Sequence, residues 1–246
     1  MRYSKMERVE ARETFPCWEK DRRIDAEKMG RVIAIDGPSG AGKTTIARLI
    51  AKELGFDYLD TGALYRAVAL ALINDGIKPE DSDDNLRDVL SKNQIAFNNG
   101  SVFLNGKDVS EDIRSVEIDH YSSVFSARKI VRNFLLYVQR DTALNSDLVV
   151  EGRDTTTVVF PDARKKIYLD ASVEERAKRR YLQFREKDID ISLDEFRRKV
   201  IERDIRDATR DIAPLKMASG ALLVDSSNLS VEQVVKKILE FIRTDP

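Results

Sequence analysis

The eight-residue stretch 37–44, Gly-Pro-Ser-Gly-Ala-Gly-Lys-Thr, constrains the fold of this chain more than any other feature. It follows an apolar run at 32–36, which has the pattern of a buried strand. It precedes a segment whose apolar residues recur with helical spacing on one side before a glycine: Ile46, Leu49, Ile50, Leu54 and Gly55. A strand, a glycine-rich turn and a helix in this order form the context of a phosphate-binding loop. An ordinary glycine-rich turn is the alternative, and the lysine, the threonine and both flanks disfavour it.

The chemistry of this stretch suits the phosphates of a nucleoside triphosphate. Glycines let successive backbone N–H groups turn toward phosphate oxygens, and the start of the helix adds partial positive charge. Lys43 would bring a cation to the outer phosphates, and Thr44 would offer its hydroxyl to Mg²⁺. The sequence therefore predicts a triphosphate site built from Gly37, Pro38, Ser39, Gly40, Ala41, Gly42, Lys43, Thr44 and Thr45.

Composition limits the kinds of protein that this chain can be. Its 246 residues suffice for one large α/β domain, and 42% of them are hydrophobic, which supports a buried core. Charged residues make up 35%, yet the net charge is only -1, so we expect no nucleic-acid partner. The single cysteine, Cys17, excludes an internal disulfide and fits a cytoplasmic location. A histidine base would have to be His120, which lies in a stretch with no other chemical signal.

The N-terminal segment differs from the rest of the chain. Residues 1–29 are rich in charge, follow neither the helical nor the strand period, and lack the apolar segment of a signal peptide. We predict that they form a disordered extension and that residues 30–246 form the folded domain. A helix that packs Phe15 and Trp18 onto the domain is the alternative. No apolar run approaches the roughly 20 residues of a membrane span, so we expect no membrane partner.

Strand and helix patterns alternate along the remainder, which predicts an α/β fold with a parallel sheet covered by helices on both faces. The predicted strands are 32–36, 56–59, 148–151, 166–169 and 221–225. Capping-box spacing marks three helix starts, at Ser172, Ser192 and Ser230. Two Asn-Gly turns within 93–109 indicate a small antiparallel meander, appended between the second and third core strands.

Polar side chains follow two of these strands at the edge where open α/β sheets bind ligands. Arg66 lies in the stretch 60–66, on a different helix face from the apolar positions, and could meet a phosphate. Glu151 and Arg153 lie in the stretch 151–154, where the arginine could bind phosphate and the glutamate could orient Mg²⁺ through water. A surface arginine and a local Arg–Asp ion pair are the alternatives.

Two later helices carry charged residues at regular spacing. Arg176, Arg179 and Arg180 share one face at i, i+3 and i+4, as the arginines of a mobile lid would. A solvated charged face has the same pattern, and the spacing alone favours it. In the next helix a stripe at i, i+4 and i+7 comprises Arg203, Asp207 and Arg210. An Arg–Asp pair at i and i+4, such as Arg203 and Asp207, commonly gives only a small stabilisation of the helix.

From about Gly30 to its end, the chain resembles the bacterial cytidylate kinases, which are P-loop kinases of nucleoside monophosphates. The resembling stretches are IAIDGPSGAGKTT, YLDTGALYRAVAL, DVSEDIRS, VEGRD, TVVFPDARKKIYLDASVEERAKRR and ERDIRDATRDIAPL. The first of these alone would fit many families, whereas DTGALYR, GRD and TVVFPDA together are far more specific. The resemblance implies a P-loop kinase core, a monophosphate-binding insertion at about 62–130 and a lid at about 176–192. It implies transfer of the γ-phosphate of ATP, with Mg²⁺, to CMP or dCMP, and we expect a monomer.

The resemblance also implies roles for single residues. The sugar of the acceptor nucleotide would be contacted by Thr61, Arg203 and Asp207. Its phosphate would be held by Arg66, Arg153 and Arg210. Its cytosine would be read by Ser123, Arg132 and Asp154. The catalytic groups would be Lys43 and three candidates for closing over the triphosphate, Arg176, Arg179 and Arg180. Thr44 would hold Mg²⁺ with the nucleotide, and Glu151 would reach it through water.

The chain departs from the family pattern at two places. Thr61 stands where members commonly have serine, and it keeps the hydroxyl. Thr155 and Thr156 stand where members usually have an apolar residue followed by glycine. A left-handed backbone at that glycine would strain a threonine, so we expect this loop to take a different path, which bears on the placement of Asp154.

Two other classes of function remain as alternatives. A different small-molecule P-loop kinase would act on UMP, AMP or shikimate. A GTP-dependent switch would need an Asn-Lys-x-Asp motif to read guanine, and the sequence contains none.

Overall fold

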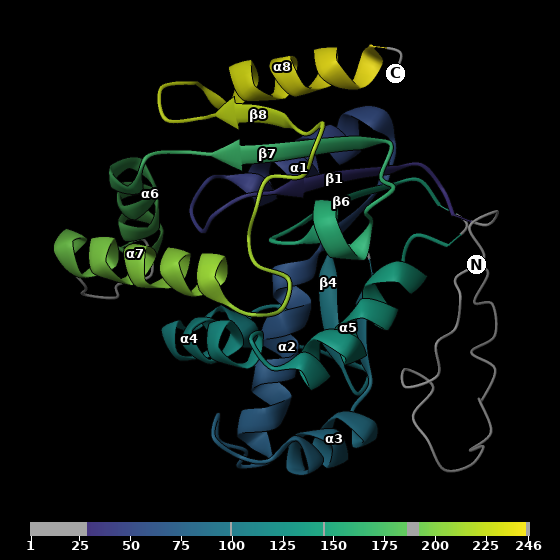
Figure 1. Cartoon of the computed structure of the whole chain (residues 1–246), viewed down its shortest axis with the longest axis vertical. Helices are drawn as coiled ribbons and strands as arrows, with labels where there is room; N and C mark the ends of the chain where they lie inside the picture. The colour runs from purple at the N-terminus through teal and green to yellow at the C-terminus, as the bar shows by residue number, and fades with distance from the viewer. Residues whose placement is uncertain (1–28, 99, 145, 186–191, 245–246) are drawn as a thin grey trace.

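The computed structural model describes residues 29–98, 100–144, 146–185 and 192–244. At its centre lies a five-stranded parallel sheet in the order β2-β6-β1-β7-β8 (Figure 1). The strands are β1 (Val32–Asp36), β2 (Asp57–Asp60), β6 (Leu148–Gly152), β7 (Lys165–Asp170) and β8 (Leu222–Asp225). Each agrees with a predicted strand to within one residue at either end. β1 and β6 are buried along their whole length, as expected for strands covered on both faces.

Helices cover both faces of this sheet, which confirms the predicted α/β class. On one face α1 (Lys43–Leu54) and α8 (Val231–Arg243) pack on a core that includes Ile33, Ile35, Ile50, Ile167 and Ile238. On the other face α2 (Thr61–Asn74) and α5 (Lys129–Asp141) pack on a core that includes Val32, Ala34, Leu64, Val68 and Leu135. Leu49, on the apolar side of α1, is 40% exposed, whereas Ile46 and Ile50 are buried.

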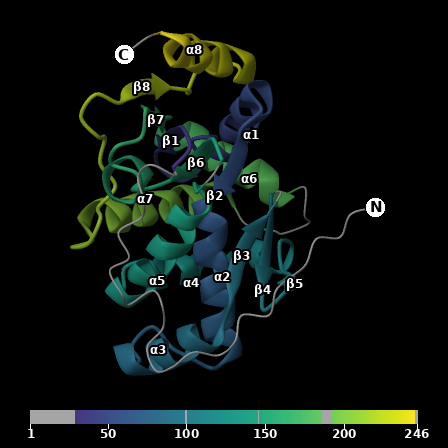
Figure 2. The same cartoon turned by 90° about the vertical axis from the view of Figure 1, so that its right-hand side faces the viewer.

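A second, three-stranded antiparallel sheet lies between β2 and β6 in chain order, as predicted. It comprises β3 (Ile95–Asn98), β4 (Ser101–Leu104) and β5 (Lys107–Asp108), and it lies beside α2 (Figure 2). Asn105 and Gly106 form the second turn, with φ angles of 52° and 81°. These left-handed angles are the ones that an Asn-Gly hairpin turn requires. Nearby elements are α3 (Asp83–Lys92), a short 3₁₀ turn (Asp112–Arg114) and α4 (Val116–Phe125).

α6 (Val173–Arg185) and α7 (Leu193–Thr209) pack against each other at one side of the parallel sheet (Figure 1). All three predicted helix starts have a serine cap: Ser172, Ser192 and Ser230 each accept a hydrogen bond from the backbone N–H three residues later. At Ser230 the box is complete, because Gln233 also accepts from the serine N–H. These caps satisfy N–H groups that a helix start leaves unpaired.

Several expectations concern segments at the limits of the described chain. Of the predicted N-terminal extension only Met29 is described, and it forms an isolated antiparallel bridge with Leu144. Of the predicted lid, residues 186–191 lie outside the described residues. The division into kinase core, insertion and lid stays a prediction. Over the described ranges, no helix has both the length and the apolar character that a membrane span needs.

Candidate active site

The glycine-rich stretch forms the turn between β1 and α1. Gly40 and Gly42 have φ angles of 81° and 94°, in the region that only glycine adopts without strain. A Cβ atom at Gly40 would also lie 3.0 Å from the carbonyl oxygen of Arg176, so the loop and α6 could not approach as they do. Lys43 is the first residue of α1, and this helix start faces the cavity described below.

Lys43 lies beneath this loop, with 5% of its surface exposed. Its Nζ donates a hydrogen bond of 2.8 Å to the carbonyl oxygen of Pro38. Burial above all, together with the nearby guanidinium of Arg153, lowers the pKa of Lys43 to about 7, although the carboxylate of Glu151 acts in the opposite direction. The amine is therefore placed to gain a proton when a triphosphate binds beside it.

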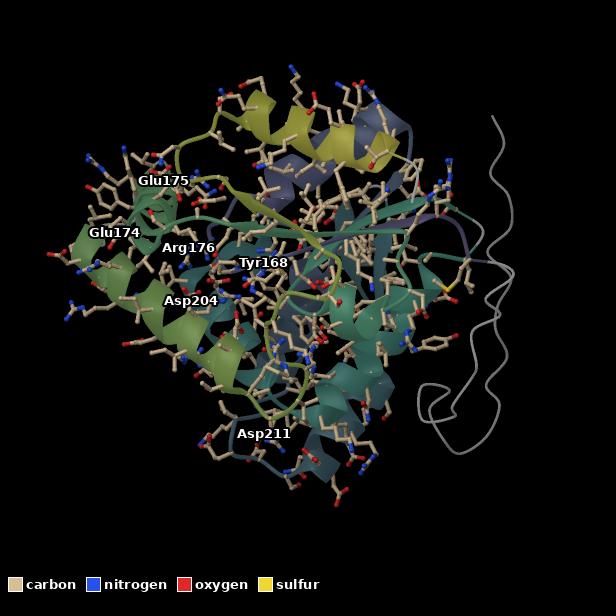
Figure 3. The ribbon with its side chains drawn as sticks, turned by 45° about the horizontal axis from the view of Figure 1, so that its top comes forward. Tyr168, Glu174, Glu175, Arg176, Asp204 and Asp211 are labelled. Carbon is tan, nitrogen blue, oxygen red and sulfur yellow. The ribbon has the colours of Figure 1, made fainter. Side chains whose placement is uncertain are left out.

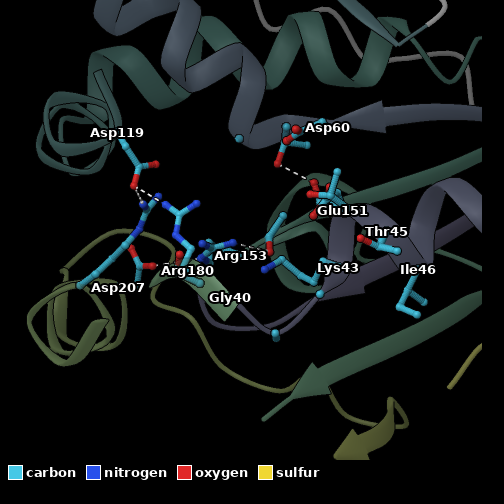
Figure 4. A pocket seen from close by; sticks show the side chains of 18 of the residues that line it. Gly40, Lys43, Thr45, Ile46, Asp60, Asp119, Glu151, Arg153, Arg180 and Asp207 are labelled. Atoms are coloured by element: carbon cyan, nitrogen blue, oxygen red, sulfur yellow. Dashed lines mark hydrogen bonds and ion pairs between the residues drawn. The ribbon is translucent and has the colours of Figure 1, made fainter. Parts of the chain in front are cut away.

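A cavity of about 470 Å³ opens over this loop, a volume typical of small-molecule sites (Figure 4). It is lined by Ser39 to Thr45 of the loop, whereas Gly37 and Pro38 are not among the lining residues. Eight of the nine residues expected at the acceptor nucleotide also line it: Thr61, Arg66, Arg132, Arg153, Asp154, Arg203, Asp207 and Arg210. The structure thus brings together in one cavity side chains as far apart in the sequence as Ser39 and Arg210.

The start of α2 forms one wall of this cavity. Asp60 caps the helix by accepting a hydrogen bond of 2.9 Å from the Ala63 N–H, and its second oxygen pairs with Arg66 Nη2 at 3.2 Å. Thr61 Oγ1 donates to the carbonyl oxygen of Glu151 at 2.7 Å. A Cβ atom at Gly152 would lie 2.5 Å from this hydroxyl, so the glycine allows α2 to lie against the end of β6.

A network of alternating charges forms the opposite wall. Asp154 is buried and pairs with Arg132, and Arg210 Nη2 lies 3.9 Å from its other oxygen. Asp207 Oδ2 accepts a hydrogen bond of 3.0 Å from Arg153 Nε, and Asp207 Oδ1 lies 3.8 Å from Arg210 Nη1. Burial and the neighbouring guanidinium of Arg132 lower the pKa of Arg210. This network holds the arginines in place while leaving their positive charge only partly neutralised.

Asp119 on α4 is a site residue that the sequence analysis missed. Its carboxylate accepts hydrogen bonds from Arg180 Nη2 at 2.6 Å and from Arg203 Nη1 at 2.8 Å (Figure 4). Burial acts to raise the pKa of Asp119, but the surrounding guanidinium groups, Arg203 above all, hold it well below its usual range. Asp119 lies in a helix without a motif around it, so no pattern in the sequence marks it.

The three arginines of α6 have different surroundings. Arg176 is buried and does not line the cavity; it forms a two-pronged ion pair with Asp204 of α7, at 2.6 and 3.0 Å (Figure 3). It also donates to the carbonyl oxygen of Ser39, so it supports the glycine-rich loop. Arg179 and Arg180 do line the cavity. Arg179 donates to the carbonyl oxygen of Ser226 at 2.8 Å.

Ser123, which the resemblance assigns to the acceptor base, and His120 lie outside the lining. Ser123 is buried, and its hydroxyl accepts a hydrogen bond of 2.7 Å from Arg206 Nη1. His120 is exposed and makes an edge-to-face contact with the ring of Tyr121. The placement of Ser123 gives no support to its expected role at the acceptor base, and the exposed position of His120 gives no sign of a catalytic role.

Neither Thr155 nor Thr156 has the left-handed backbone that would strain a threonine. The described non-glycine residues with positive φ are Asn105 and Ala213. The two threonines instead begin a π-helical turn, Thr155–Val159, and both donate hydrogen bonds to the buried carboxylate of Asp36.

The residues beside Lys43 fit a hard divalent cation. The Glu151 carboxylate is buried, accepts a hydrogen bond of 2.8 Å from the Tyr58 hydroxyl, and also interacts with the Thr44 hydroxyl. Burial and the neighbouring charge of Asp60 raise the pKa of Glu151. Hydroxyl and carboxylate oxygens of this kind are the ligands that Mg²⁺ takes, directly or through water.

Positive charge dominates the cavity as a whole. Among the described lining residues, seven arginines and Lys43 face five carboxylates. Three buried guanidinium N–H groups have no hydrogen-bond partner within the described residues: Arg66 Nε, Arg203 Nε and Arg210 Nη2. A buried donor without an acceptor is costly, so these groups mark positions where the oxygens of an anion would bind.

Comparison with known proteins agrees with this chemistry. The model of the cytidylate kinase family matches residues 33–244. The cytidylate kinase of Thermodesulfovibrio yellowstonii is 48% identical over 224 residues, which cover 88% of this chain and 100% of that protein. Those of Thermosipho melanesiensis and Geobacter sulfurreducens are each 47% identical, covering 86% and 89% of this chain and 96% and 95% of those proteins. The chain belongs to the cytidylate kinase family.

Proposed function

We propose that this protein is an ATP-dependent cytidylate kinase, which transfers the γ-phosphate of ATP to CMP or dCMP and yields ADP with CDP or dCDP. The observation that carries this proposal is the shared cavity in which Arg66, Arg153 and Arg210 face Lys43 and the glycine-rich loop. In such a cavity one phosphate-bearing ligand would lie on the loop and a second one on the arginines. The relatives that match most of the chain are named cytidylate kinases.

Transfer between two phosphates needs alignment and charge neutralisation more than a covalent catalyst. Lys43 and the loop amides hold the donor, and the arginine cluster holds the phosphate of the acceptor opposite them. The attacking oxygen is already anionic, so no general base is required, and the exposed position of His120 is consistent with this. Arg179 and Arg180 line the cavity and are the arginines of α6 placed to neutralise charge on the transferring group.

Thr44 and Glu151 are the residues that would hold Mg²⁺ with the nucleotide. The ion supplies charge neutralisation on the phosphate oxygens when it is bound. Glu151 is kept in position by Tyr58, and the Thr61 hydroxyl fixes the backbone of Glu151. These contacts orient the carboxylate toward the start of α1.

Asp154 supports selectivity for cytosine. A carboxylate accepts a hydrogen bond from the amino group of cytosine, whereas uracil has an oxygen at that position and would repel it. The Asp154 carboxylate is 6% exposed and held by Arg132, so its orientation is restricted. A mispaired buried group of this kind costs about 1–3 kcal/mol, or roughly 10- to 100-fold in binding.

A coupled assay of ADP formation across acceptors tests the proposal. CMP, dCMP, UMP, AMP and shikimate would each be supplied with ATP and Mg²⁺ at equal concentration. We expect kcat/KM to be highest for CMP or dCMP. Higher turnover with AMP or shikimate, or ADP release that no acceptor accelerates, would show that the assignment is wrong.

A further inference from the structure

Asp36 has a buried carboxylate that accepts four hydrogen bonds. It is the last residue of β1, and none of its surface is exposed. Its Oδ1 accepts from the N–H and hydroxyl of Thr155, at 2.9 and 2.7 Å. Its Oδ2 accepts from the N–H and hydroxyl of Thr156, at 2.7 and 2.6 Å. Both threonines are themselves buried, so water does not compete for these bonds.

These bonds connect the loops that face the two substrates. Asp36 directly precedes Gly37, where the glycine-rich loop begins, and Thr155 directly follows Asp154. The carbonyl oxygen of Asp154 in turn accepts from the N–H groups of Val158 and Val159, at 2.9 and 3.1 Å. The carboxylate of Asp36 therefore caps the turn that begins at Asp154, and a negative charge is favourable at the start of a helical turn.

Asp154 is thus held from two directions. Its side chain is held by Arg132, and its backbone is held by the turn that Thr155 and Thr156 anchor on Asp36. The backbone amides alone would give the buried carboxylate two partners. The two hydroxyls double that number, and hydrogen bonds to a charged group are the strong ones.

We propose that Thr155 and Thr156 are positioning residues for recognition of the acceptor base, acting through Asp36 to fix the orientation of Asp154. The inference rests on the proposed function, because it assigns these residues to the reading of cytosine. The hydroxyls of Thr155 and Thr156 add two hydrogen bonds to Asp36 at the end of β1. They hold the turn more rigidly than the two backbone N–H groups alone would.

The test is the double variant Thr155→Val/Thr156→Val, which removes both hydroxyls and keeps the side-chain shape. We expect KM for CMP to rise about tenfold, since two charge-assisted hydrogen bonds are lost. The kcat/KM ratio of CMP to UMP should fall, because a loosely held Asp154 discriminates less. KM for ATP should change much less, since the glycine-rich loop keeps its other contacts to α6.

Two control variants separate positioning from simple packing. Thr157→Val alters the same turn, but the Thr157 hydroxyl is buried without a partner among the described residues, so the CMP/UMP ratio should stay at the wild-type value. Thr155→Ser/Thr156→Ser keeps both hydroxyls and should retain wild-type selectivity. If the double valine variant does not fold, the single variants Thr155→Val and Thr156→Val are compared with Thr157→Val in the same way.

The outcomes are distinct. A valine variant that phosphorylates CMP with the KM and the CMP/UMP ratio of Thr157→Val overturns this inference and leaves the proposed function intact. A wild-type protein that fails to phosphorylate CMP overturns the proposed function itself.

Discussion

The Asp119 carboxylate on α4 accepts a hydrogen bond of 2.6 Å from Arg180 on α6. The same carboxylate accepts a second one, of 2.8 Å, from Arg203 on α7. One acidic side chain therefore joins α4 to the α6–α7 pair across the cavity. It keeps two guanidinium groups close together that would otherwise repel each other, in a region where the phosphates of the substrates are expected to bind.

Replacement of Asp119 by asparagine should destabilise the ligand-free protein by about 1–3 kcal/mol, because partly buried guanidinium groups lose their counter-charge. Bound ATP and CMP should restore much of that loss, since their phosphates supply negative charge to the same arginines. Thermal unfolding with and without both nucleotides measures the two effects. Glu117→Gln, an exposed change on the same helix, is the matched control and should shift neither midpoint. An equal loss with and without nucleotides would contradict this account of Asp119.

ATP binding should be accompanied by proton uptake in mildly alkaline solution. The pKa of Lys43 is lowered from 10.5 to about 7, so at pH 8.5 the amine is mostly neutral in the free protein. The triphosphate favours the charged form and raises that pKa, so binding takes up a proton, close to one per site. The same shift means that the contribution of this group to stability rises with pH between about 7 and 10.5, because the unfolded chain holds the proton there.

Calorimetric titration of ATP in buffers of different ionisation enthalpy measures this uptake. The enthalpy of binding should vary with the buffer for the wild-type protein and not for Lys43→Ala. A buffer-independent enthalpy for both proteins at pH 8.5 would rule out the lowered pKa.

Arg176 should act through stability and ATP affinity rather than as a group on the transferring phosphate. Arg176→Ala leaves Asp204 unpaired and removes support from the loop at Ser39, so we expect a loss of about 3 kcal/mol and a higher KM for ATP. Arg176→Lys should recover little, because a lysine cannot form the two-pronged pair. Chemical denaturation and ATP-dependent rates provide both readouts.

Arg197→Ala is the matched control for this prediction. Arg197 also pairs α7 with α6, through Glu174 at 3.4 Å, but both side chains are largely exposed. Its removal should change stability by less than about 1 kcal/mol. Equal losses of stability in Arg176→Ala and Arg197→Ala would contradict the assigned role of Arg176 in supporting the loop.

Local patterns predicted most of the fold. The five core strands, the antiparallel meander and the capped helix starts all follow from apolar periodicity, turn residues and serine caps, which act within a few residues. Periodicity placed Leu49 on the apolar side of its helix, but it does not define how far the neighbouring layer extends over that side. In the structure α8 and the sheet cover the side of α1 with Ile46 and Ile50 and leave Leu49 exposed.

The site could be predicted less completely. Resemblance to a family identified most of the residues that line the cavity. The local sequence alone did not distinguish Arg66 from a surface arginine, or Arg153 from a member of a local Arg–Asp ion pair. Helical spacing placed Arg176, Arg179 and Arg180 on one face, and the resemblance implied one shared role for them. In the structure the first supports the loop and the others face the cavity. Asp119 gave no signal, because its importance comes from arginines 61 and 84 residues away.

Asp154 should set the preference for cytosine. Asp154→Ala should narrow the ratio of kcat/KM for CMP over UMP by about 10- to 100-fold, because the acceptor of the amino-group hydrogen bond is lost. Steady-state kinetics with both acceptors give this ratio. Asp162→Ala, a change at an exposed aspartate shortly after the same loop, should leave the ratio unaltered. The role assigned to Asp154 fails if both variants keep the wild-type ratio.

The fate of the γ-phosphate tests the central claim most directly. ATP labelled at that phosphate would be incubated with Mg²⁺ and CMP, and the label would be followed in the separated products. The account predicts that label appears in CDP, with little free phosphate, and that Lys43→Ala slows this transfer by about 100- to 1,000-fold while the protein stays folded. Label that accumulates as free phosphate whether or not CMP is present, or near-normal turnover in Lys43→Ala, would contradict it.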